Sequence, residues 1–531
     1  MSAVEASRLH GSMDKGMAKR IFIPGDSVAV ALGSDEVAGR FRDLARKRKV
    51  EIEIVRNGSR GACHLEPLVE AETPEGRAAW GPVGPDGAEG VFESAVMGAG
   101  EGSRHPLYLG LPEEMPYLKG QTRITFKRAG LIDPISIDDY VADGGLAGLR
   151  KALGMTPEEI IAEVKASGLR GRGGAAFSTG IKRETALKTE SAVKYVVCNA
   201  DEGDSGSFSD RMLIEGDPFS LIEGMIIASL AVGAQEGYVY LRSEYPYARE
   251  AFKKALKAAY GSGLLGKDVM GGKKRFDVHL VTGAGSYVCG EETALLESLE
   301  NRRGMVRPRP PVPAVSGLFG RPTILNNVIT LASVANIFET GSKGYKSLGA
   351  GMSAGTLPFQ LSGNVKRPGL VEAPFGIGLE ELIYGFGGGT ASGRPVKAVQ
   401  IGGPLGAYFP SSAVKEIRLT YEDLASRGGM LGHGGIVVFD DRADMADLAR
   451  RSLEFAGIES CGKCTPCRLG SMRSHEFLER IMEGDNAPAN RAVLREIFAA
   501  SANLSLCGLG GMMHLPVESL MRHFPGEFGL K

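Results

Sequence analysis

Residues 458–470 read IESCGKCTPCRLG, and three cysteines occur in this stretch at intervals of three residues. A fourth cysteine follows in LSLCGLGGM, 40 positions further along the chain at Cys507. Each iron of a [4Fe–4S] cluster takes one thiolate, so three clustered cysteines and one distant cysteine are a suitable ligand set. Structural zinc sites more often use two separated pairs of ligands. We therefore expect one [4Fe–4S] cluster, with zinc, a redox dithiol or buried free cysteines as the alternatives, on Cys461, Cys464, Cys467 and Cys507.

The composition is that of an ordinary globular protein with several domains. The chain has 531 residues, of which 43% are hydrophobic and 24% are charged, and its net charge is −1. A net charge so close to zero gives no overall electrostatic attraction to nucleic acid or to an anionic membrane. The start, MSAVEASRLHGSMDKGMAKR, lacks an apolar signal-peptide core, and the apolar run 221–234 is too short for a membrane span. With seven cysteines and no disulfide framework, we expect a cytoplasmic protein without nucleic-acid binding or direct membrane insertion.

The cysteines lie in a helical C-terminal region. From about residue 444, apolar residues recur at helical spacing in ADMADLARRSLEFAGIES, RLGSMRSHEFLERIMEG and NRAVLREIFAASANLS. Four helices can form a bundle with the cysteines between them. The preceding residues 357–435 carry short strands among many glycines and prolines, which predicts a small β-rich domain.

Further upstream, strands alternate with helices, which is typical of a layered α/β domain. The strands KYVVCN, YVYLR and FDVHLVTG are interspersed with helical stretches up to about residue 340. A helix is predicted to begin at Thr156, with Pro157 in its first turn, and to stop at Gly168. Residues 20–100 form a smaller α/β unit, with strand-like RIFIPGDSVAVAL and VEIEIVRNG and a helix capped by Asp35 between them.

A glycine-rich loop, SGLRGRGGAAFSTGIK, spans residues 167–182. It formally contains G-x-G-x-x-A, but a helix precedes it where a dinucleotide fingerprint requires a strand. Its glycines still allow backbone N–H groups to approach an anion or a flat ring, and Phe177 can stack on an aromatic system. The alternative is a plain surface loop.

Two further motifs follow predicted strands, where α/β proteins bind their ligands. CNADEGDSGSFSDR, residues 198–211, brings together acidic and amide side chains that suit a cation or ribityl and ribose hydroxyls. GAGSYVCGEETALLESLE, residues 283–300, is a glycine turn followed by a helix that starts at paired glutamates.

These motifs, together with RPRPPVPAVSGLFGRPTILNNV and ESCGKCTPCR, occur in one order along the chain. The set resembles the NADH-binding flavoprotein subunit of respiratory complex I and its relatives, over about residues 145–531. Those relatives include the diaphorase subunit of NAD-reducing hydrogenases and the beta subunit of NAD-dependent formate dehydrogenases. The resemblance implies FMN, NAD(H) and one [4Fe–4S] cluster as cofactors.

The implied fold is a multidomain α/β protein. A thioredoxin-like domain is expected over residues 1–110, without a cluster of its own because Cys63 is its single cysteine. An FMN- and NAD(H)-binding α/β domain is expected over 111–345 and a β-grasp domain of the soluble ligand-binding type over 346–437. A four-helix [4Fe–4S] domain is expected over 438–531.

The resemblance also assigns the site residues, motif by motif. The FMN cradle would comprise Gly171, Arg172, Gly173, Lys182, Asn199, Asp201, Glu202, Gly290, Glu291, Asn326 and Asn327. The NAD(H) side would comprise Phe177, Asp204, Tyr287 and Glu292. Hydride transfer between stacked rings needs no general base, so we predict no catalytic acid or base.

The expected function is electron transfer between the cluster and NAD(H) through FMN. The sequence DEGDSGSF looks more like the formate dehydrogenase or hydrogenase branches than complex I, and the opening PGDSVAVALG favours the beta subunit of a molybdenum formate dehydrogenase. Its partners would be a [2Fe–2S] thioredoxin-like subunit and a large catalytic subunit with molybdenum and iron–sulfur centres. The alternatives are the diaphorase subunit of an NAD-reducing hydrogenase, the NADH dehydrogenase subunit of complex I and, from another class, a non-catalytic iron–sulfur scaffold.

Overall fold

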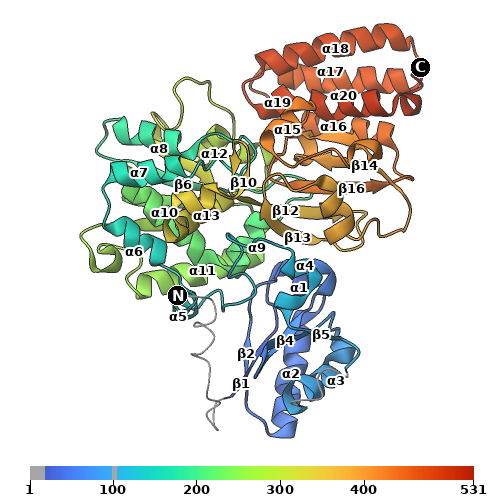
Figure 1. Ribbon diagram of the computed structural model, residues 1–531. Coiled ribbons are helices and arrows are strands. Elements are labelled where there is room, and N and C mark those ends of the chain that lie inside the picture. The colour runs from blue at the N-terminus through green and yellow to red at the C-terminus, as the bar shows by residue number, and fades with distance from the viewer. Residues whose placement is uncertain (1–17, 99–104, 531) are drawn as a thin grey trace. The chain divides into compact units, whose positions relative to one another are not determined.

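The computed structural model describes residues 18–98 and 105–530, which form two compact units (Figure 1). Of the described residues, one unit comprises those up to Ser59 together with those between Leu65 and Lys119. The other comprises Arg60–His64 and Gly120–Lys531 and carries every motif described above except the N-terminal one.

The first unit is a five-stranded mixed sheet in the order β2-β1-β3-β4-β5. Its first two strands are parallel and are joined through a helix, and the remaining pairs are antiparallel, an arrangement that agrees with the expected thioredoxin-like unit. The elements are β1 (Lys19–Phe22), α2 (Ser34–Arg48), β2 (Ile52–Val55), β3 (Val69–Thr73), β4 (Gly76–Trp80), α3 (Ala88–Phe92) and β5 (Tyr108–Gly110).

Two local predictions in this unit were wrong. The stretch after β1 does not continue as a strand, because Asp26 accepts hydrogen bonds from the N–H groups of Val28 and Ala29 and starts helix α1 (Ser27–Ala31). A side-chain cap of this kind outweighs the β propensity of alternating valines in so short a segment. Asp35 does not cap α2 either: Gly33 occupies the N-cap position, and Asp35 lies in the first turn.

In the second unit, a four-stranded parallel sheet in the order β8-β7-β6-β9 forms the centre of what we call the parallel-sheet domain, residues 137–346. Because all four strands run in one direction, their carboxyl ends share one edge of the sheet. The strands are β6 (Tyr195–Ala200), β7 (Glu236–Leu241), β8 (Asp277–Thr282) and β9 (Thr323–Asn327). The helices include α5 (Ile137–Ala142), α6 (Ala147–Leu153), α7 (Pro157–Ala166), α8 (Thr179–Lys188), α9 (Ser209–Gly216), α10 (Pro218–Val232), α11 (Pro246–Gly261), α12 (Glu292–Leu299), α13 (Val328–Thr340) and α14 (Ser342–Lys346).

The helix before the glycine loop has the predicted ends. Thr156 caps α7 in a capping box with Glu159, Pro157 is the first helical residue, and Gly168 follows the helix with a φ of +70°. The loop therefore begins at the end of a helix, as expected from the sequence. The apolar run at 221–234 belongs largely to α10, which is buried against its neighbours. No helix within the described residues has the length and apolar character needed to cross a membrane.

The remaining two domains of this unit follow in sequence. The β-rich domain, residues 356–440, is a mixed sheet in the order β13-β12-β16-β14-β15. The helical domain, residues 445–523, packs four longer helices around a core that includes Leu453 and Leu478. The elements are β12 (Thr356–Gly363), β13 (Gly369–Pro374), β14 (Val396–Ile401), β15 (Ala407–Pro410), α15 (Tyr421–Ser426), β16 (Gly435–Asp440), α16 (Met445–Glu459), α17 (Thr465–Met482), α18 (Ala487–Leu504), α19 (Gly508–Met512) and α20 (His514–His523).

Candidate cofactor site

The carboxyl edge of the parallel sheet brings two of the sequence motifs together. Asn199, on β6, donates from its side-chain nitrogen to the carbonyl oxygen of Gly290 at 2.7 Å. Its side-chain oxygen accepts from the backbone N–H of Asp201 at 3.0 Å. One amide therefore joins the NADEGD motif to the CGEE motif, although the two lie about 90 residues apart in sequence.

The glycine loop presents an open backbone face. Gly171 donates its N–H to the carbonyl oxygen of Phe177 at 2.8 Å, which closes the loop. Among the described residues, a Cβ added at Gly171 would meet only the backbone of Phe177, at 3.6 Å and 3.9 Å. A Cβ at Gly173 would instead lie 2.9 Å from Cβ of Asn327, so this glycine allows the loop to pack on the end of β9. The Phe177 ring is 55% exposed, an unusual state for a phenylalanine and a suitable one for stacking on a ligand.

The side chain of Arg172 has a structural role in this loop. It is buried, and its guanidinium donates to the carbonyl oxygen of Ala354 and to the Tyr345 hydroxyl, each at 2.8 Å. The same group lies 4.7 Å from the centre of the Phe375 ring. These contacts tie the loop to the start of the β-rich domain. The guanidinium of Arg172 therefore already makes its hydrogen bonds within the protein.

A second set of charges lies at the start of α12. Lys182 places its ammonium 3.0 Å from the Glu292 carboxylate and donates to the carbonyl oxygen of Leu325 at 3.0 Å. Arg309 contacts the other oxygen of Glu292, also at 3.0 Å. Glu291 caps the helix, because its carboxylate accepts from the N–H groups of Thr293 and Ala294. The predicted Lys182, Glu291 and Glu292 are thus neighbours.

Buried acceptors at this edge that have no hydrogen-bond partner within the described residues include Oδ2 of Asp201 and Oδ1 of Asn326. Burial raises the pKa of Asp201 to about 7, with Glu244 and Glu459 adding to the effect and Arg242 opposing it. A buried acceptor without a donor is costly, and ribityl hydroxyls are donors of the required kind. Together with the open face of Gly171, these atoms fit a bound FMN.

Tyr287 connects this edge to the helical domain. Its hydroxyl donates to Asp204 at 2.9 Å, and its backbone N–H donates to the Glu459 carboxylate at 3.1 Å. Its ring packs edge-on against Phe455 of α16, with 4.9 Å between the ring centres. The loop at Gly403 of the β-rich domain approaches Asp204 so closely that a Cβ there would lie 2.5 Å from the Asp204 side chain. The three domains therefore meet at the Asp204–Tyr287 pair.

The four cysteines lie together beside this junction. Cys464 is the N-cap residue of α17, and Cys467 is buried in its first turn. Burial raises the pKa of the Cys467 thiol, and the nearby Cys464 and Cys461 raise it further. Burial likewise raises the pKa of Cys507 to about 11, with added effects of Glu291 and Cys467. Four neighbouring cysteines, which share packing contacts with Tyr287 and Val288, and the positive end of an 18-residue helix would suit a [4Fe–4S] cluster.

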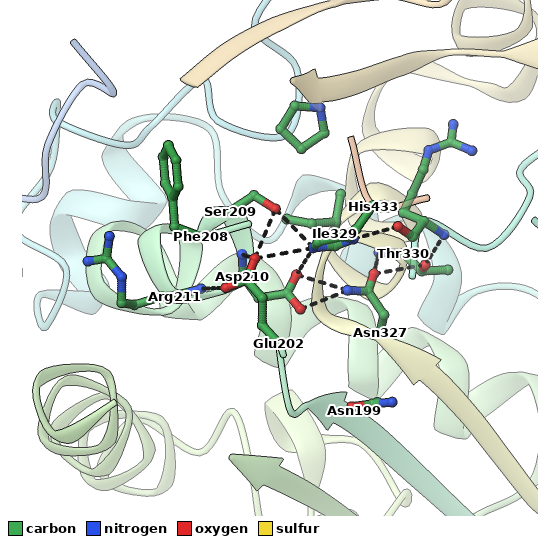
Figure 2. A network of polar contacts seen from close by, with 12 residues as sticks. Asn199, Glu202, Phe208, Ser209, Asp210, Arg211, Asn327, Ile329, Thr330 and His433 are labelled. Atoms are coloured by element: carbon green, nitrogen blue, oxygen red, sulfur yellow. Dashed lines mark hydrogen bonds and ion pairs between the residues drawn. The ribbon is translucent and has the colours of Figure 1, made fainter. Parts of the chain in front are cut away.

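The sequence analysis missed one participant. His433, from the loop before β16, reaches into the parallel-sheet domain and contacts Glu202 and Asp210 (Figure 2). A lone histidine in a glycine-rich loop carries no local signal of such a role, and Asp210 lies in its motif without an assigned function. Asn327 is part of the same network, because its amide nitrogen donates to Asp210 at 2.8 Å and 2.9 Å.

Comparison with known families supports this division of the chain. Residues 164–336 match the Nuo51 FMN-binding domain, residues 358–406 match the SLBB domain, and residues 447–531 match the NADH-ubiquinone oxidoreductase-F iron-sulfur binding region. The cofactors of the chain are accordingly FMN, NAD(H) and a [4Fe–4S] cluster.

Individual relatives extend the match. The HndC protein of the NADP-reducing hydrogenase of Solidesulfovibrio fructosivorans is 46% identical over 410 residues, which cover 77% of this chain and 83% of that protein. An NADH-quinone oxidoreductase subunit of Rhizobium meliloti is 44% identical over 393 residues, or 74% of this chain and 93% of the relative. A crystal structure of an NAD⁺-reducing [NiFe]-hydrogenase in the H₂-reduced state superposes with a TM-score of 0.68 and 27% identity, covering 97% of this chain and 84% of that chain.

Proposed function

Because the chain belongs to the family of FMN- and [4Fe–4S]-binding NADH dehydrogenase subunits, we propose that it is the diaphorase subunit of a cytoplasmic NAD-dependent formate dehydrogenase. In this role it passes electrons from the [4Fe–4S] cluster to NAD⁺. Formate is oxidised on a large molybdenum and iron–sulfur subunit, and a [2Fe–2S] thioredoxin-like subunit completes the complex.

The chemistry explains why the flavin lies between the other two cofactors. FMN exchanges two electrons with NAD(H) as a hydride and single electrons with the cluster. The residues of this chain supply position. Gly171 leaves space for a flat ring, Phe177 offers an exposed ring beside it, and the acceptors of Asp201 and Asn326 suit ribityl hydroxyls.

One observation carries the electron-transfer proposal: the segment 287–292, which contains the predicted NAD(H)-binding residues Tyr287 and Glu292, also lies beside the cysteines. Within residues 287–292, Tyr287 packs against Phe455 of the helical domain and belongs to the same apolar cluster as Cys467 and Cys507. Cys461 and Cys507 also pack against the core that contains Val288 and Cys289. Electron transfer between the flavin and the cluster requires such proximity. A scaffold whose cluster is only structural has no use for it.

The choice of formate rests on the motifs rather than on the comparisons. DEGDSGSF resembles the formate dehydrogenase and hydrogenase branches, the opening PGDSVAVALG resembles the formate dehydrogenase branch, and the N-terminal unit is an addition to the complex I type of subunit. The second candidate is an NAD-reducing hydrogenase diaphorase. The 97% coverage of this chain by a hydrogenase structure favours that candidate over complex I.

The test is to purify the tagged chain anaerobically with its native partners and identify them by mass spectrometry and metal analysis. We expect a large molybdenum subunit and NAD⁺ reduction that depends on formate. A nickel–iron subunit with hydrogen-dependent NAD⁺ reduction would establish the hydrogenase role instead, and copurifying quinone-reducing membrane subunits would assign the chain to complex I. A Cys467→Ser chain serves as the control, since it should still recruit its partners while formate-dependent NAD⁺ reduction is lost.

A further inference from the structure

His433 makes the cofactor site depend on a residue of another domain. It lies between α15 and β16 in the β-rich domain and is 5% exposed. Its Nδ1 lies 2.6 Å from the carbonyl oxygen of Arg172 in the glycine loop. Its Nε2 lies 3.2 Å from Oδ1 of Asp210 and 3.3 Å from Oε1 of Glu202 (Figure 2).

The partners of the ring determine its charge. A carbonyl oxygen only accepts hydrogen bonds, so Nδ1 must carry a proton. Nε2 faces two carboxylate oxygens, which only accept, and the Ser209 hydroxyl at 3.0 Å, which can accept from the ring while donating to Glu202. A proton on Nε2 is the state that suits all three neighbours. Burial alone would lower the pKa of His433, but Asp210 and Glu202 outweigh it and raise the pKa well above its ordinary value. The residue is therefore a buried imidazolium.

The imidazolium in turn governs the two carboxyl groups. Burial would raise the pKa of Glu202, but His433 and the backbone N–H groups of Asp210 and Arg211 lower it overall. The pKa of Asp210 is raised to about 6 by burial, with His433 opposing the rise and Glu202 adding to it. As the pH falls toward 6, Asp210 therefore begins to take up a proton while Glu202 stays ionised, and at higher pH both carboxylates face the one positive charge of His433.

The other charged and titratable groups around His433, Glu202 and Asp210 already have partners of their own. Arg211, on α9, pairs with Glu215 at 2.9 Å. Tyr245, before α11, donates its hydroxyl to Glu202 at 3.1 Å, and burial raises its pKa well above the physiological range. Asp204 lies near enough for His433 to lower its pKa against the effect of burial. His433 is therefore the cation that directly contacts both Glu202 and Asp210 among the described residues.

The contacts of His433 close a ring of hydrogen bonds. The N–H of Arg172 donates to the Thr330 hydroxyl at 2.8 Å, and the N–H of Thr330 donates to the side-chain oxygen of Asn327 at 3.1 Å. Asn327 then donates to Asp210, which meets His433, which returns to the carbonyl of Arg172. The glycine loop, the start of α9 and the end of β9 are joined in one circuit, and Glu202 of the NADEGD motif is attached to it through His433.

We propose that His433 is a positioning residue of the cofactor site: as an imidazolium supplied by the β-rich domain, it places one positive charge between Glu202 and Asp210 and holds three cofactor motifs in the arrangement that binds FMN. The proposal rests on the family's flavin binding and does not depend on which partner supplies electrons. A divalent metal is the competing occupant of the same side chains, since one imidazole and two carboxylates are possible ligands. The backbone and side-chain donors already directed at both carboxylates favour the proton.

The test compares FMN binding by flavin-free protein for His433→Gln, Asp210→Asn/His433→Gln and the control His279→Gln, which alters an exposed histidine on β8. We expect His433→Gln to weaken FMN binding about tenfold or more at pH 8, because two buried carboxylates lose their counter-ion. Lowering the pH toward 6 should restore affinity, since the carboxylate pair then takes up a proton. The double variant should bind more tightly than the single variant at pH 8, with little pH dependence, and His279→Gln should match the wild type.

Three results would overturn the proposal. One is wild-type FMN affinity in His433→Gln across this pH range, and another is a double variant that binds no better than the single one. The third is one tightly bound metal ion per chain that disappears in His433→Gln. Because the variants can also fold poorly, ¹⁵N-histidine NMR of the wild-type protein gives an independent answer. Both ring nitrogens of His433 should remain protonated at pH 7.5, and a neutral ring would refute the proposal.

Discussion

The two redox sites of the larger unit are built in opposite ways. At the cluster site, three of the four cysteines fall within residues 461–467, at the start of a single helix. The flavin site draws on segments between residues 171 and 327 and is closed by His433 from the β-rich domain. The cluster site is therefore a local feature of the sequence, whereas the flavin site exists only after three-dimensional folding.

This difference predicts different responses to mutation. A cluster held by four thiolates should fail when one ligand is removed. A flavin held by many separate hydrogen bonds and contacts should weaken by degrees, since each contributes about 1 kcal/mol. Four substitutions test that contrast, from the largest expected effect to the smallest.

Replacing the buried cluster ligand should have the largest effect. Cys467→Ser is expected to remove the EPR signal of the reduced cluster. This effect should exceed the roughly 10–100-fold loss of metal affinity that follows when a residue that only supports a metal ligand is altered. Reduction of FMN by NADH should stay within about twofold of the wild type, because the cradle does not use this thiol. Cys63→Ser is the control, and its cluster signal should be unchanged. Loss of FMN along with the cluster in Cys467→Ser would show that the two sites are not separate.

A substitution in the glycine loop should have the second-largest effect. Gly171→Ala places a methyl group on the open face without meeting protein atoms closer than 3.6 Å, so the melting temperature of the flavin-free protein should hardly change. FMN binding should weaken about 5–150-fold, the equivalent of the 1–3 kcal/mol that overpacking costs. Calorimetry and flavin fluorescence measure the two quantities. Unchanged FMN affinity in Gly171→Ala would place the flavin away from this face.

Replacing Asp201 should change stability and FMN binding in opposite directions. Its pKa is raised to about 7 in the folded chain, so charging it opposes folding, and the penalty grows as the pH rises from about 4 to about 7. In the flavin-free protein, Asp201→Asn should raise the unfolding free energy by up to about 4 kcal/mol at pH 8 and leave it unchanged near pH 4. FMN binding should weaken in the same variant. A loss of stability at pH 8 would contradict the electrostatic explanation.

Phe177 should give the smallest effect. Phe177→Ala removes an exposed ring, so the KM for NADH should rise about 2–10-fold, as expected for 0.5–1.5 kcal/mol of aromatic stacking. The affinity for FMN and the unfolding temperature should match the wild type. Steady-state kinetics with an artificial electron acceptor provide the measurement. A lower kcat at unchanged KM would assign Phe177 to the flavin rather than to the nucleotide.

Much of the architecture could be predicted from local patterns. The capping signal of Thr156 and Pro157 gave the correct start for α7, and the helix before the glycine loop rightly argued against a dinucleotide fingerprint. The helical domain followed from its apolar spacing. The first unit shows the limit: a single Asp26 cap turns Ser27–Ala31 into a helix, despite a strand-like alternation of valine and alanine.

The site was harder to predict because its closure is not local. Residues such as Asn199 and Gly290 could be named only because their motifs resemble a known family, and their hydrogen bond is visible only in the structure. Arg172 illustrates a different limit: positive charge in a glycine loop suggests phosphate binding, but here its guanidinium is buried among Tyr345, Ala354 and Phe375. His433 lies more than 200 residues from Glu202 and Asp210, and no sequence period links them.

The central claim is that electrons pass between NAD(H) and the four-cysteine cluster through FMN. It is tested most directly by an anaerobic NADH titration of the purified, fully loaded chain, followed by visible absorption and EPR. We predict that the flavin absorption bleaches and that the EPR signal of a reduced [4Fe–4S] cluster appears in the same titration. Flavin and cluster that both remain oxidised with excess NADH, despite full occupancy, would contradict the account.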